Sequence, residues 1–452
     1  MNKLELNATL SIALLYIVRM LGLFMILPVL PLLLDEIATP LLIGIALGIY
    51  GLSQAVLQIP LGLLSDKVGR KPVIAMGLVV FIVGSLVAAY STDIYGIIFG
   101  RFLQGCGAIS STLLALVSDV TRVDNRAKAM AIIGMSIGAS FAVALVLGPW
   151  INSLYGIEGI FLGTAIAGIL GICVLFLFIP DVKIKSGAPN LLLEKMAKLI
   201  KDSALMRLTF SVFALHFLLM SSFVAFPSVM QSTGEIDAAN HHWVYLIILL
   251  TTFFLMGPFM WLSDKKGLAR QMMLTMVALF ICSALIMSKT VSYYPILLAM
   301  VLFFMAFNLL EVILPALVSK IAPAGSRGAA MGIYSTAQFA GAFGGGVVGG
   351  YAMGYGDISY VMYANIALCC LWLALGLGLP KMGNIKSMIY SLAPSDEASA
   401  HSQLEALLSV DGVIEAVVVE TDGIVYLKVD SDILDAKALD ELKRGNKLPT
   451  VS

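Results

Sequence analysis

The sequence predicts an all-α membrane protein whose twelve transmembrane helices form two six-helix pseudo-repeats, followed by a small α+β domain. Three observations support this fold class. First, 60% of the 452 residues are hydrophobic and only 12% are charged, whereas about 25% of a soluble domain is charged. Second, the chain contains twelve apolar runs of membrane-spanning length. Third, a basic, glycine-containing turn of the first half recurs in the second half.

The predicted spans are apolar runs of about 20 residues, the length that crosses a bilayer as a helix. We expect two bundles, at residues 1–183 and 205–386, with a lysine-rich cytoplasmic linker at 184–204 and a separate domain at 387–452. The N-terminus lacks the basic region and cleavage site of a signal peptide, so the first run is predicted to remain as a span. The runs are centred near Leu21, Leu52, Phe81, Gly107, Ala139, Gly168, Leu218, Leu250, Ala278, Phe307, Ala340 and Leu371.

The distribution of Lys and Arg predicts that both termini are cytoplasmic, because basic loops stay on that side of the membrane. With the N-terminus inside, the loops on the other side contain only Lys289. One helix more or less would destroy this asymmetry, so the asymmetry also supports the number of spans. The basic residues on the predicted cytoplasmic side are Lys67, Arg70, Lys71, Arg122, Arg126, Lys128, the linker lysines, Lys265, Lys266, Arg270, Lys320, Arg327, Lys381 and Lys386.

Two pairs of similar segments indicate that the halves are repeats. The turn that contains Asp66 recurs around Asp264, 198 residues later. Residues 118–130 (SDVTRVDNRAKAM) align with residues 319–331 (SKIAPAGSRGAAM), which lie 201 residues later. Such similar offsets predict a parallel repeat about an axis along the membrane normal, and in transporters this arrangement places the substrate path between the halves.

The composition also excludes several classes of protein. Lys plus Arg and Asp plus Glu number 28 each, so no excess charge favours a nucleic-acid partner. The sequence shows no metal-ligand spacing and no nucleotide motif, and it predicts neither a metal, nor a cofactor, nor an enzyme. For a transporter without a nucleotide motif, an ion gradient remains as the driving force of transport. The cysteines lie in apolar runs and are interpreted as packing residues; they are Cys106, Cys173, Cys282, Cys369 and Cys370.

The composition changes after Lys386, and the following pattern predicts a small ferredoxin-like domain with strand, helix, hairpin and helix in this order. A fourth strand is doubtful, because Pro449 interrupts the remaining residues 448–452. The expected strands are residues 387–392, 413–420 and 424–430, and the expected helices are residues 396–408 and 433–442.

Residues 62–72, GLLSDKVGRKP, form the most specific motif of the chain. Gly62 lets two helices approach, Gly69 permits a tight turn, and Asp66 places a carboxylate at the membrane edge. Arg70 and Lys71 hold the loop on the cytoplasmic side. A loop that only set the topology would not need the aspartate and both glycines at this spacing. The segment resembles motif A of the major facilitator superfamily.

This resemblance implies a gating role. In the superfamily, the aspartate of motif A faces the N-terminal end of the eleventh helix, where the helix dipole favours an anion, and the arginine pairs with an acid at the end of the fourth helix. By analogy, Asp66 is expected to face the helix that starts near Arg327, and Arg70 is expected to pair with Asp119. These contacts can hold only while the cytoplasmic side is closed, so the motif is predicted to be a latch that favours the outward-open state.

Two further segments resemble the twelve-helix drug/proton antiporters of this superfamily. Residues 21–22 (LG) and 28–31 (PVLP) resemble the pattern of the first helix, for which a proline-kinked span is the alternative explanation. Residues 101–105 (RFLQG) resemble motif B, whose arginine is associated with proton coupling, so Arg101 is a proton-coupling candidate. A charge inside a span indicates function by default, and structural pairing is the alternative.

The glycines of the fifth span only partly match motif C of the antiporters. Gly134, Gly138 and Gly148 are present, but Ala144 stands where the first glycine of the motif is expected. Close packing of small residues explains these glycines equally well. The glycines at 341–350 lack the Lys-Ser/Thr of a phosphate loop and are predicted to serve helix packing.

Other polar side chains inside predicted spans are functional candidates, because such groups are costly in a membrane. Glu311, in the tenth span, is a candidate proton or cation site. Arg19 and His216 are candidates for its countercharge or for a contact to an anionic substrate, and structural pairing is the alternative for each. The substrate-cavity candidates are Arg19, Gln54, Gln58, His216 and Asn308.

The resemblance covers residues 1 to about 385, and the appended domain narrows it to a group of bacterial inner-membrane transporters that carry such a domain. The shared runs include RMLGLFMILPVLP, GIYGLSQAVLQIP and FNLLEVILPAL. The resemblance implies a monomeric secondary transporter of the inner membrane that exports a small molecule by alternating access in exchange for protons. An uptake symporter and a membrane-anchored ligand sensor are the alternatives. The appended domain contains no cysteine, which favours a regulatory or docking role over metal carriage.

Overall fold

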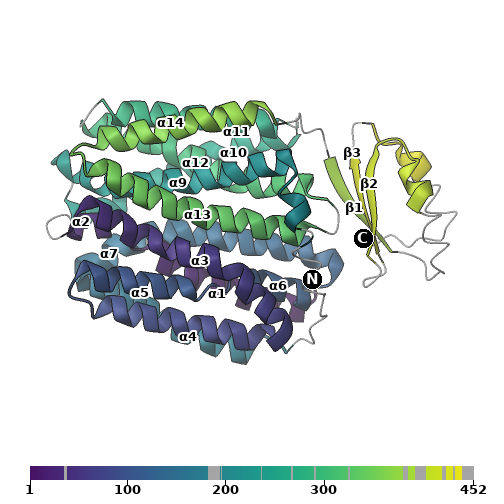
Figure 1. The fold of residues 1–452 in the computed structure, drawn as a ribbon, viewed down its shortest axis with the longest axis horizontal. Coiled ribbons are helices and arrows are strands. Elements are labelled where there is room, and N and C mark those ends of the chain that lie inside the picture. Colours follow the sequence, from purple (N-terminus) through teal and green to yellow (C-terminus); the bar gives the residue numbers. More distant parts are fainter. Residues whose placement is uncertain are drawn as a thin grey trace.

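In the computed structural model, the chain forms a helical bundle with a small sheet beyond one of its ends (Figure 1). The structure describes residues 1–34, 38–181, 194, 196–235, 237–265, 268–289, 292–323, 326–379, 385–391, 404–419, 424–430 and 433–439. The first-half helices are α1 (Lys3–Phe24), α2 (Leu30–Leu34), α3 (Pro40–Val68), α4 (Arg70–Ala89), α5 (Ile94–Cys106), α6 (Ser110–Val120) and α7 (Val123–Phe178). The second half contains α9 (Ser203–Ser232), η1 (Ala238–Asn240), α10 (His241–Lys265), α11 (Ala269–Met287), α12 (Tyr293–Ile321), α13 (Arg327–Met353) and α14 (Ile358–Leu377).

The described helices give twelve membrane crossings, as the sequence predicts. Ten helical segments are long and apolar enough to cross a membrane by length and composition. One of them lies in α7, which has 56 residues and contains Gly156 with a φ of 66°, a backbone conformation that favours glycine, so α7 makes two crossings. The twelfth crossing is α13, whose 27 residues include many glycines and are therefore less hydropathic.

The two halves lie side by side, with the first half purple to blue and the second teal to green in Figure 1. The N-terminus lies at the end of the bundle that faces the sheet. We call this the basic end, because the α3–α4, α6–α7 and α12–α13 connections meet there and carry Arg70, Lys71 and Arg122. We call the other end of the bundle, where α3 begins and α13 ends, the opposite end. The segments repeated in sequence thus occupy equivalent helix ends in the two halves.

The fourth predicted span, centred near Gly107, is present over Ile94–Val120, but its helix is interrupted near its centre. Residues 107–109 separate α5 from α6. A Cβ built on Gly107 would lie 2.3 Å from the carbonyl oxygen of Gly77 in α4, so the chain at the break lies directly against the neighbouring helix. Apolar composition does not reveal such a break, because the residues on both sides of it are equally suited to the membrane.

Two rows of glycines let α13 lie between α3 of the first half and α9 of the second half. A Cβ on Gly341 or Gly345 would lie 2.1 Å from a backbone carbonyl oxygen of α9. A Cβ on Gly346 or Gly350 would lie 2.4 Å from a backbone carbonyl oxygen of α3. The members of each row are four residues apart and therefore share one helix face. The prediction that these glycines serve helix packing is confirmed.

The C-terminal domain contains three antiparallel strands in the order β1-β3-β2. They are β1 (Ile385–Ser391), β2 (Val413–Val419) and β3 (Ile424–Asp430), within two residues of the predicted strands. Leu407, Val425 and Leu427 are among the residues of a separate apolar core. Residues 404–408 and 436–439 are helical; the rest of the two predicted helices and the doubtful fourth strand lie outside the described residues. The strand and helix order agrees with the predicted small α+β domain.

Candidate functional site

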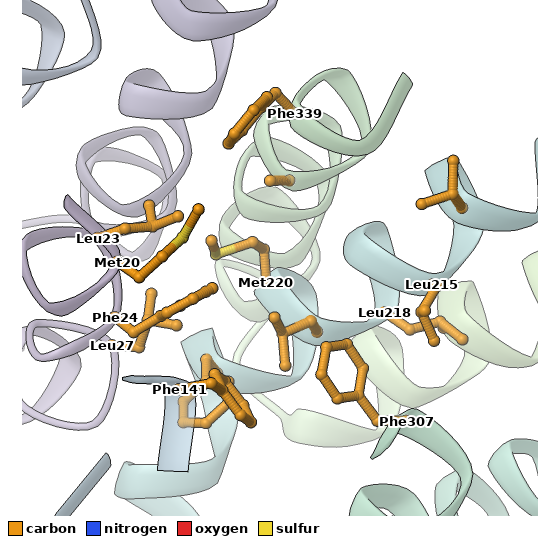
Figure 2. Close-up of a cluster of buried hydrophobic side chains, with 14 of the residues drawn as sticks. Met20, Leu23, Phe24, Leu27, Phe141, Leu215, Leu218, Met220, Phe307 and Phe339 are labelled. Atoms are coloured by element: carbon orange, nitrogen blue, oxygen red, sulfur yellow. The ribbon is translucent and has the colours of Figure 1, made fainter. Parts of the chain in front are cut away.

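A cluster of buried apolar side chains fills the centre of the interface between the halves (Figure 2). The first half contributes residues of α1, of the turn that follows it and of α7, and the second half contributes residues of α9, α12 and α13. Phe141 of α7 joins the halves, since its ring centroid lies 5.0 Å from that of Phe24 and 5.3 Å from that of Phe307. The labelled members are Met20, Leu23, Phe24, Leu27, Phe141, Leu215, Leu218, Met220, Phe307 and Phe339.

Glu311 lies one helical turn from this cluster, towards the basic end. It follows Phe307 by four residues on α12, and residues at this spacing share a helix face. Because Phe307 touches Phe141 of the first half, that face of α12 is turned towards the interface. The Glu311 side chain is 27% exposed, and its Oε2 lies 3.6 Å from Nε2 of His216 in α9. This distance is too long for a hydrogen bond, and Oε2 has no other partner among the described residues.

Polar groups of α9 and α13 contact both nitrogens of the His216 ring. Nδ1 lies 3.1 Å from the carbonyl oxygen of Val212, which can only accept, so Nδ1 carries a hydrogen. Nε2 lies 2.8 Å from the side-chain amide nitrogen of Gln338 in α13, which can only donate. His216 is thus held by groups of α9 and α13 beside the carboxyl group of Glu311.

The interface is closed at the opposite end by direct contact between the backbones of α3 and α13. A Cβ on Gly44 would lie 2.0 Å from the carbonyl oxygen of Gly346, and a Cβ on Gly51 would lie 2.6 Å from that of Phe339. The last described hydrogen bond across these helices joins Nε2 of Gln58 to Oγ1 of Thr336, at 2.9 Å. The two halves are thus in contact from the opposite end to the level of Glu311.

Towards the basic end, the same interface has open space. Gly134 and Gly138 share a face of α7 with Phe141, yet a Cβ on either would have no heavy atom within 4 Å. The same holds for Gly328 and Gly332, which precede Thr336 on α13. The partial match to motif C therefore falls on two glycines that border open space, whereas Gly148 packs against the backbone of Met25, directly after α1.

Arg19 does not meet Glu311; its head group is directed into the first bundle. Nη2 donates to the Tyr50 hydroxyl and to Oε1 of Gln54, each at 2.7 Å. Gln54 in turn donates to Ser110 Oγ at 2.9 Å. The residue is only 2% exposed, and its Nε and Nη1 have no hydrogen-bond partner among the described residues. Of the two proposed countercharges of Glu311, the structure brings only His216 close.

Arg101 is fully buried and contacts the end of α1, where residues 25–29 separate α1 from α2. Nη1 donates to the carbonyl oxygen of Gly22 at 2.9 Å and to Oε1 of Gln104 at 2.9 Å, and Nη2 lies 3.4 Å from the carbonyl oxygen of Leu23. These carbonyls belong to the last turn of α1, where a helix leaves its carbonyl groups without partners. The sequence correctly indicates a charged residue inside the span. The carbonyl groups that this residue contacts can be identified only from the fold.

The motif A residues gather at the basic end of the first half. Gly69, with a φ of 110°, ends α3 and lets α4 begin at the next residue. Arg70 forms ion pairs with Asp66 and, at 2.9 Å, with Asp119 of α6. Gly62 lies against Ser111 of α6. The ion pair described for Asp66 lies within its own half rather than with α13.

Lys71 and Asn308 have simpler roles in this structure. Nζ of Lys71 lies 2.8 Å from Oδ1 of Asp181, whose side chain is 91% exposed. Nδ2 of Asn308 donates to Thr252 Oγ1 at 3.2 Å and links α12 to α10 inside the second half. Neither contact crosses the interface between the halves.

Several residues of the interface were not singled out from the sequence. Gln338 and Thr336 are polar residues within the apolar run that starts at Gly332, and this pattern could have indicated them. Tyr334 is 4% exposed, with no described partner for its hydroxyl. At the basic end, Glu5 accepts hydrogen bonds from the Arg122 backbone at 2.9 Å and from Asn125 Nδ2 at 3.0 Å. Glu5 thereby ties the start of α1 to the α6–α7 connection.

Comparisons with known proteins agree with this architecture. The family model of the Major Facilitator Superfamily matches residues 12–233 and 208–387. The chain is 38% identical over 445 residues to the inner membrane transport protein YajR of Escherichia coli (strain K12), covering 97% of this chain and 98% of the relative. It is 33% identical over 150 residues to the class H tetracycline resistance protein of Pasteurella multocida, covering 32% of this chain and 36% of that protein.

Solved structures show the same fold at low sequence identity. A bacterial homologue of the human lysosomal transporter Spinster, inward-facing and occupied, superimposes with a TM-score of 0.67 at 12% identity, covering 84% of this chain and 98% of the other. The human organic anion transporter MFSD10 superimposes with a TM-score of 0.64 at 18% identity, covering 83% of this chain and all of the other chain.

Proposed function

Because the chain belongs to the Major Facilitator Superfamily and is a membrane transporter, we propose that it exports a small molecule by alternating access in exchange for protons. The observation that carries this proposal is the position of the Glu311–His216 pair. This pair lies at the boundary between the sealed and the open parts of the interface. A titratable group at such a boundary is exposed first to one side of the membrane and then to the other as the halves move.

The basic end is assigned to the cytoplasm. Basic loops stay on that side of a membrane, and the loops at the opposite end contribute Lys289 alone. With this orientation, the space beside Gly134, Gly138 and Gly332 faces the cytoplasm, and the α3–α13 contact closes the outer side. The structure then corresponds to an inward-open state. The protein is placed in a bacterial inner membrane, as a monomer with both termini inside.

Proton coupling is assigned to Glu311, with His216 and Gln338 as positioning residues. A carboxylate that is partly exposed to a water-filled space takes up and releases protons readily, whereas a sealed one does not. Gln338 and the carbonyl oxygen of Val212 contact the two ring nitrogens and hold the imidazole beside the carboxyl group. Arg101 also remains a candidate for proton coupling, to which it would contribute a fixed positive charge in the first half.

Motif A is assigned to the control of this movement. In the inward-open state, Arg70 is held by Asp66 and Asp119. When the cytoplasmic side closes, the start of α13 approaches the end of α3, and its helix dipole favours the nearby carboxylate of Asp66. Asp66 would thus stabilise the outward-open state, in which the protein takes up protons from outside.

The names of two relatives favour export over uptake as the direction of transport. Two of the matched proteins bear the name tetracycline resistance protein, and their matches to this chain are 33% identical. A transporter that confers resistance must remove its substrate from the cell. The segments of the first half that resemble drug/proton antiporter motifs also favour export.

The proposal is tested with the full-length protein in liposomes that contain a pH-sensitive dye. A panel of compounds is screened for those that move protons across the membrane, and direction is read from the sign of the pH change. Export by antiport predicts that substrate and protons move in opposite directions, and Glu311→Gln should abolish the coupled proton movement. Glu158→Gln, which removes an exposed carboxylate of α7, is the control. Movement in the same direction would indicate a symporter, and ligand binding without any flux would indicate a sensor.

A further inference from the structure

We propose that Arg207 and Arg270 bind the phosphate group of an anionic phospholipid at the end of α14, in the leaflet at the basic end of the bundle. The site lies on the second half, away from the interface between the halves. It therefore does not depend on the direction or the coupling of transport.

Helices α9, α11 and α14 meet around a buried tryptophan near their basic ends. Nε1 of Trp372 in α14 donates to Ser211 Oγ of α9 at 2.8 Å, and this oxygen lies 3.8 Å from Sδ of Met273 in α11. Trp372 is fully buried. A Cβ on Gly376 would lie 3.1 Å from the Met273 side chain, so α14 lies against α11 almost to its last residue. These contacts fix the three helix ends relative to one another.

Two arginines gather at the end of α14, one helical turn beyond this contact. Arg207 precedes Ser211 by four residues and therefore shares its face of α9. A Cβ on Gly378 would lie 2.3 Å from Nη1 and 2.8 Å from Nη2 of Arg207, so the guanidinium lies directly against the backbone after α14. Nη2 of Arg270, the second residue of α11, donates to the carbonyl oxygen of Leu377. Both positive charges thus approach the same helix end.

The carbonyl groups of this helix end satisfy only part of the two guanidinium groups. A helix C-terminus leaves carbonyl groups without partners and favours a cation, which explains the hydrogen bond of Arg270. Nε of Arg270 is nevertheless buried without a hydrogen-bond partner among the described residues. The guanidinium of Arg207 forms no hydrogen bond or ion pair in the described part of the chain. Asp202, the acid nearest to Arg207 in the sequence, accepts hydrogen bonds from the first N–H groups of α9 instead.

At the equivalent place in the first half, the protein supplies its own negative charge. Lys71 is the second residue of α4, as Arg270 is the second residue of α11. Nζ of Lys71 lies 2.8 Å from Oδ1 of Asp181, which follows the end of α7. The chain after α14 cannot supply such a carboxylate, because residues 358–395 contain neither Asp nor Glu. The second half therefore has two cations where the first half has an ion pair.

The surface beside the two arginines is suited to an acyl chain. Helices α11 and α14 lie side by side at the edge of the bundle away from the first half (Figure 1). Leu377 is 64% exposed, although its carbonyl group accepts from Arg270. It ends an exposed face of α14 at spacings of three and four residues, which share one side of a helix. The members of this face are Tyr363, Ala367, Cys370, Ala374 and Leu377.

A phospholipid on this face would have its phosphate group at the level of the two arginines. Guanidinium groups bind phosphate oxygens through paired hydrogen bonds, and basic pockets between membrane helices bind anionic head groups. A zwitterionic lipid also brings a cation, for which the described residues offer no carboxylate here. The charges therefore favour an anionic lipid.

The test measures the binding of single lipids to purified full-length protein in detergent by native mass spectrometry. Two lipids with identical acyl chains are compared, phosphatidylglycerol, which is anionic, and phosphatidylcholine, which is zwitterionic. We expect phosphatidylglycerol to bind at least about tenfold more tightly, which corresponds to about 1.4 kcal/mol. Inorganic phosphate in large excess should not displace it, because free phosphate gains nothing from the apolar face of α14.

Arg207→Gln and Arg270→Gln should each reduce the preference for phosphatidylglycerol severalfold, and the double variant should abolish it. Lys71→Gln is the matched control, because it removes a cation of the same end whose partner is a carboxylate. It should bind both lipids like the wild type. Size-exclusion chromatography shows whether each variant is folded, and the comparison of the two lipids on the wild-type protein needs no variant.

Equal binding of the two lipids by the wild type would overturn the site, and so would a preference that persists in the double variant. A preference that Lys71→Gln lowers as much as Arg207→Gln would also overturn it, because the attraction would then come from the basic end as a whole. Displacement of phosphatidylglycerol by inorganic phosphate would show that a free anion, rather than a lipid, is the ligand. None of these outcomes bears on the proposed export.

Discussion

The two ends of the interface between the halves share α13 and yet differ in how closely the halves approach. At the opposite end, glycines bring the backbones of α3 and α13 into contact, with Gly44 against Gly346. At the basic end, glycines of α7 and α13 border open space, as Gly134 and Gly332 do. Glycine therefore has two roles in this interface. At the opposite end it permits close contact between the backbones of the two halves, and at the basic end it leaves space between them.

This difference also explains where the polar groups of the interface lie. Gln58, Thr336, His216, Glu311 and Gln338 lie at the level where contact gives way to open space. Polar groups deep in the sealed part would need partners in every state, since an unpaired buried group costs about 1–3 kcal/mol. At the boundary, water or a ligand can satisfy them in one state and protein groups in the other.

The largest expected effect comes from breaking the seal. In Gly44→Ala the new Cβ would lie 2.0 Å from the carbonyl oxygen of Gly346, so α3 and α13 must separate. We expect the conformational equilibrium to shift away from the inward-open state and transport to fall sharply. A cysteine at Leu27, which is fully buried, should become at least about tenfold more reactive to an impermeant maleimide added outside, a shift of about 1.4 kcal/mol.

Gly332→Ala is the matched control, because the same methyl group on α13 would meet no heavy atom within 4 Å. The five native cysteines are replaced by serine in every protein compared. If Gly44→Ala and Gly332→Ala label equally, the α3–α13 contact does not hold the outer side closed.

A smaller effect is expected at the latch. In Asp66→Asn, Arg70 keeps its ion pair with Asp119 and its hydrogen bond to Ser65, so the inward-open state should lose little stability. Transport should nevertheless fall severalfold, because the variant no longer stabilises the start of α13 in the outward-open state. Initial transport rates in liposomes and thermal unfolding provide the two measurements.

The control for this variant is Asp181→Asn, which removes the exposed partner of Lys71. Exposed ion pairs contribute about 0–1 kcal/mol, and this one lies outside the interface between the halves. Transport by Asp66→Asn at the wild-type rate would remove the aspartate from the gating mechanism.

The smallest effect is expected from the C-terminal domain. Its described contacts with the helices include a hydrogen bond from Nζ of Lys428 to the carbonyl oxygen of Ile321, 2.8 Å long, at the end of α12. The domain has its own apolar core. Deletion of residues 388–452 should therefore leave a folded bundle that still transports, as measured by size-exclusion chromatography and flux. Loss of the folded bundle would show that the domain is required for its stability.

Much of this fold could be predicted from the sequence, because span length and hydropathy are local properties. The twelve crossings follow from them, and the C-terminal strands follow from alternation and from the sequence Thr421-Asp422-Gly423, which is typical of a turn. The break at Gly107 and the contacts of Arg101 could not be predicted in this way. A helix break depends on which neighbours supply hydrogen bonds, and these neighbours are distant in sequence.

The candidate site was only partly visible in the sequence. Glu311 and His216 were identified as polar residues in spans, but Arg19 was considered beside them, although it faces Tyr50 and Gln54. Which intramembrane charges meet depends on the rotation of each helix about its axis, and hydropathy does not report this rotation. Nor does it report the conformational state, on which the proposed contact of Asp66 with α13 depends.

The central claim is that the two ends of the interface open alternately, and reciprocal labelling tests it most directly. Single cysteines are placed at Leu27, in the sealed cluster, and at Gly134, beside the open space. Labelling of both is measured in membrane vesicles over a range of pH and with each transported compound. The account predicts that any condition raising the reactivity at Leu27 lowers it at Gly134. A condition that raises both together, or reactivities that never change, would contradict alternating access.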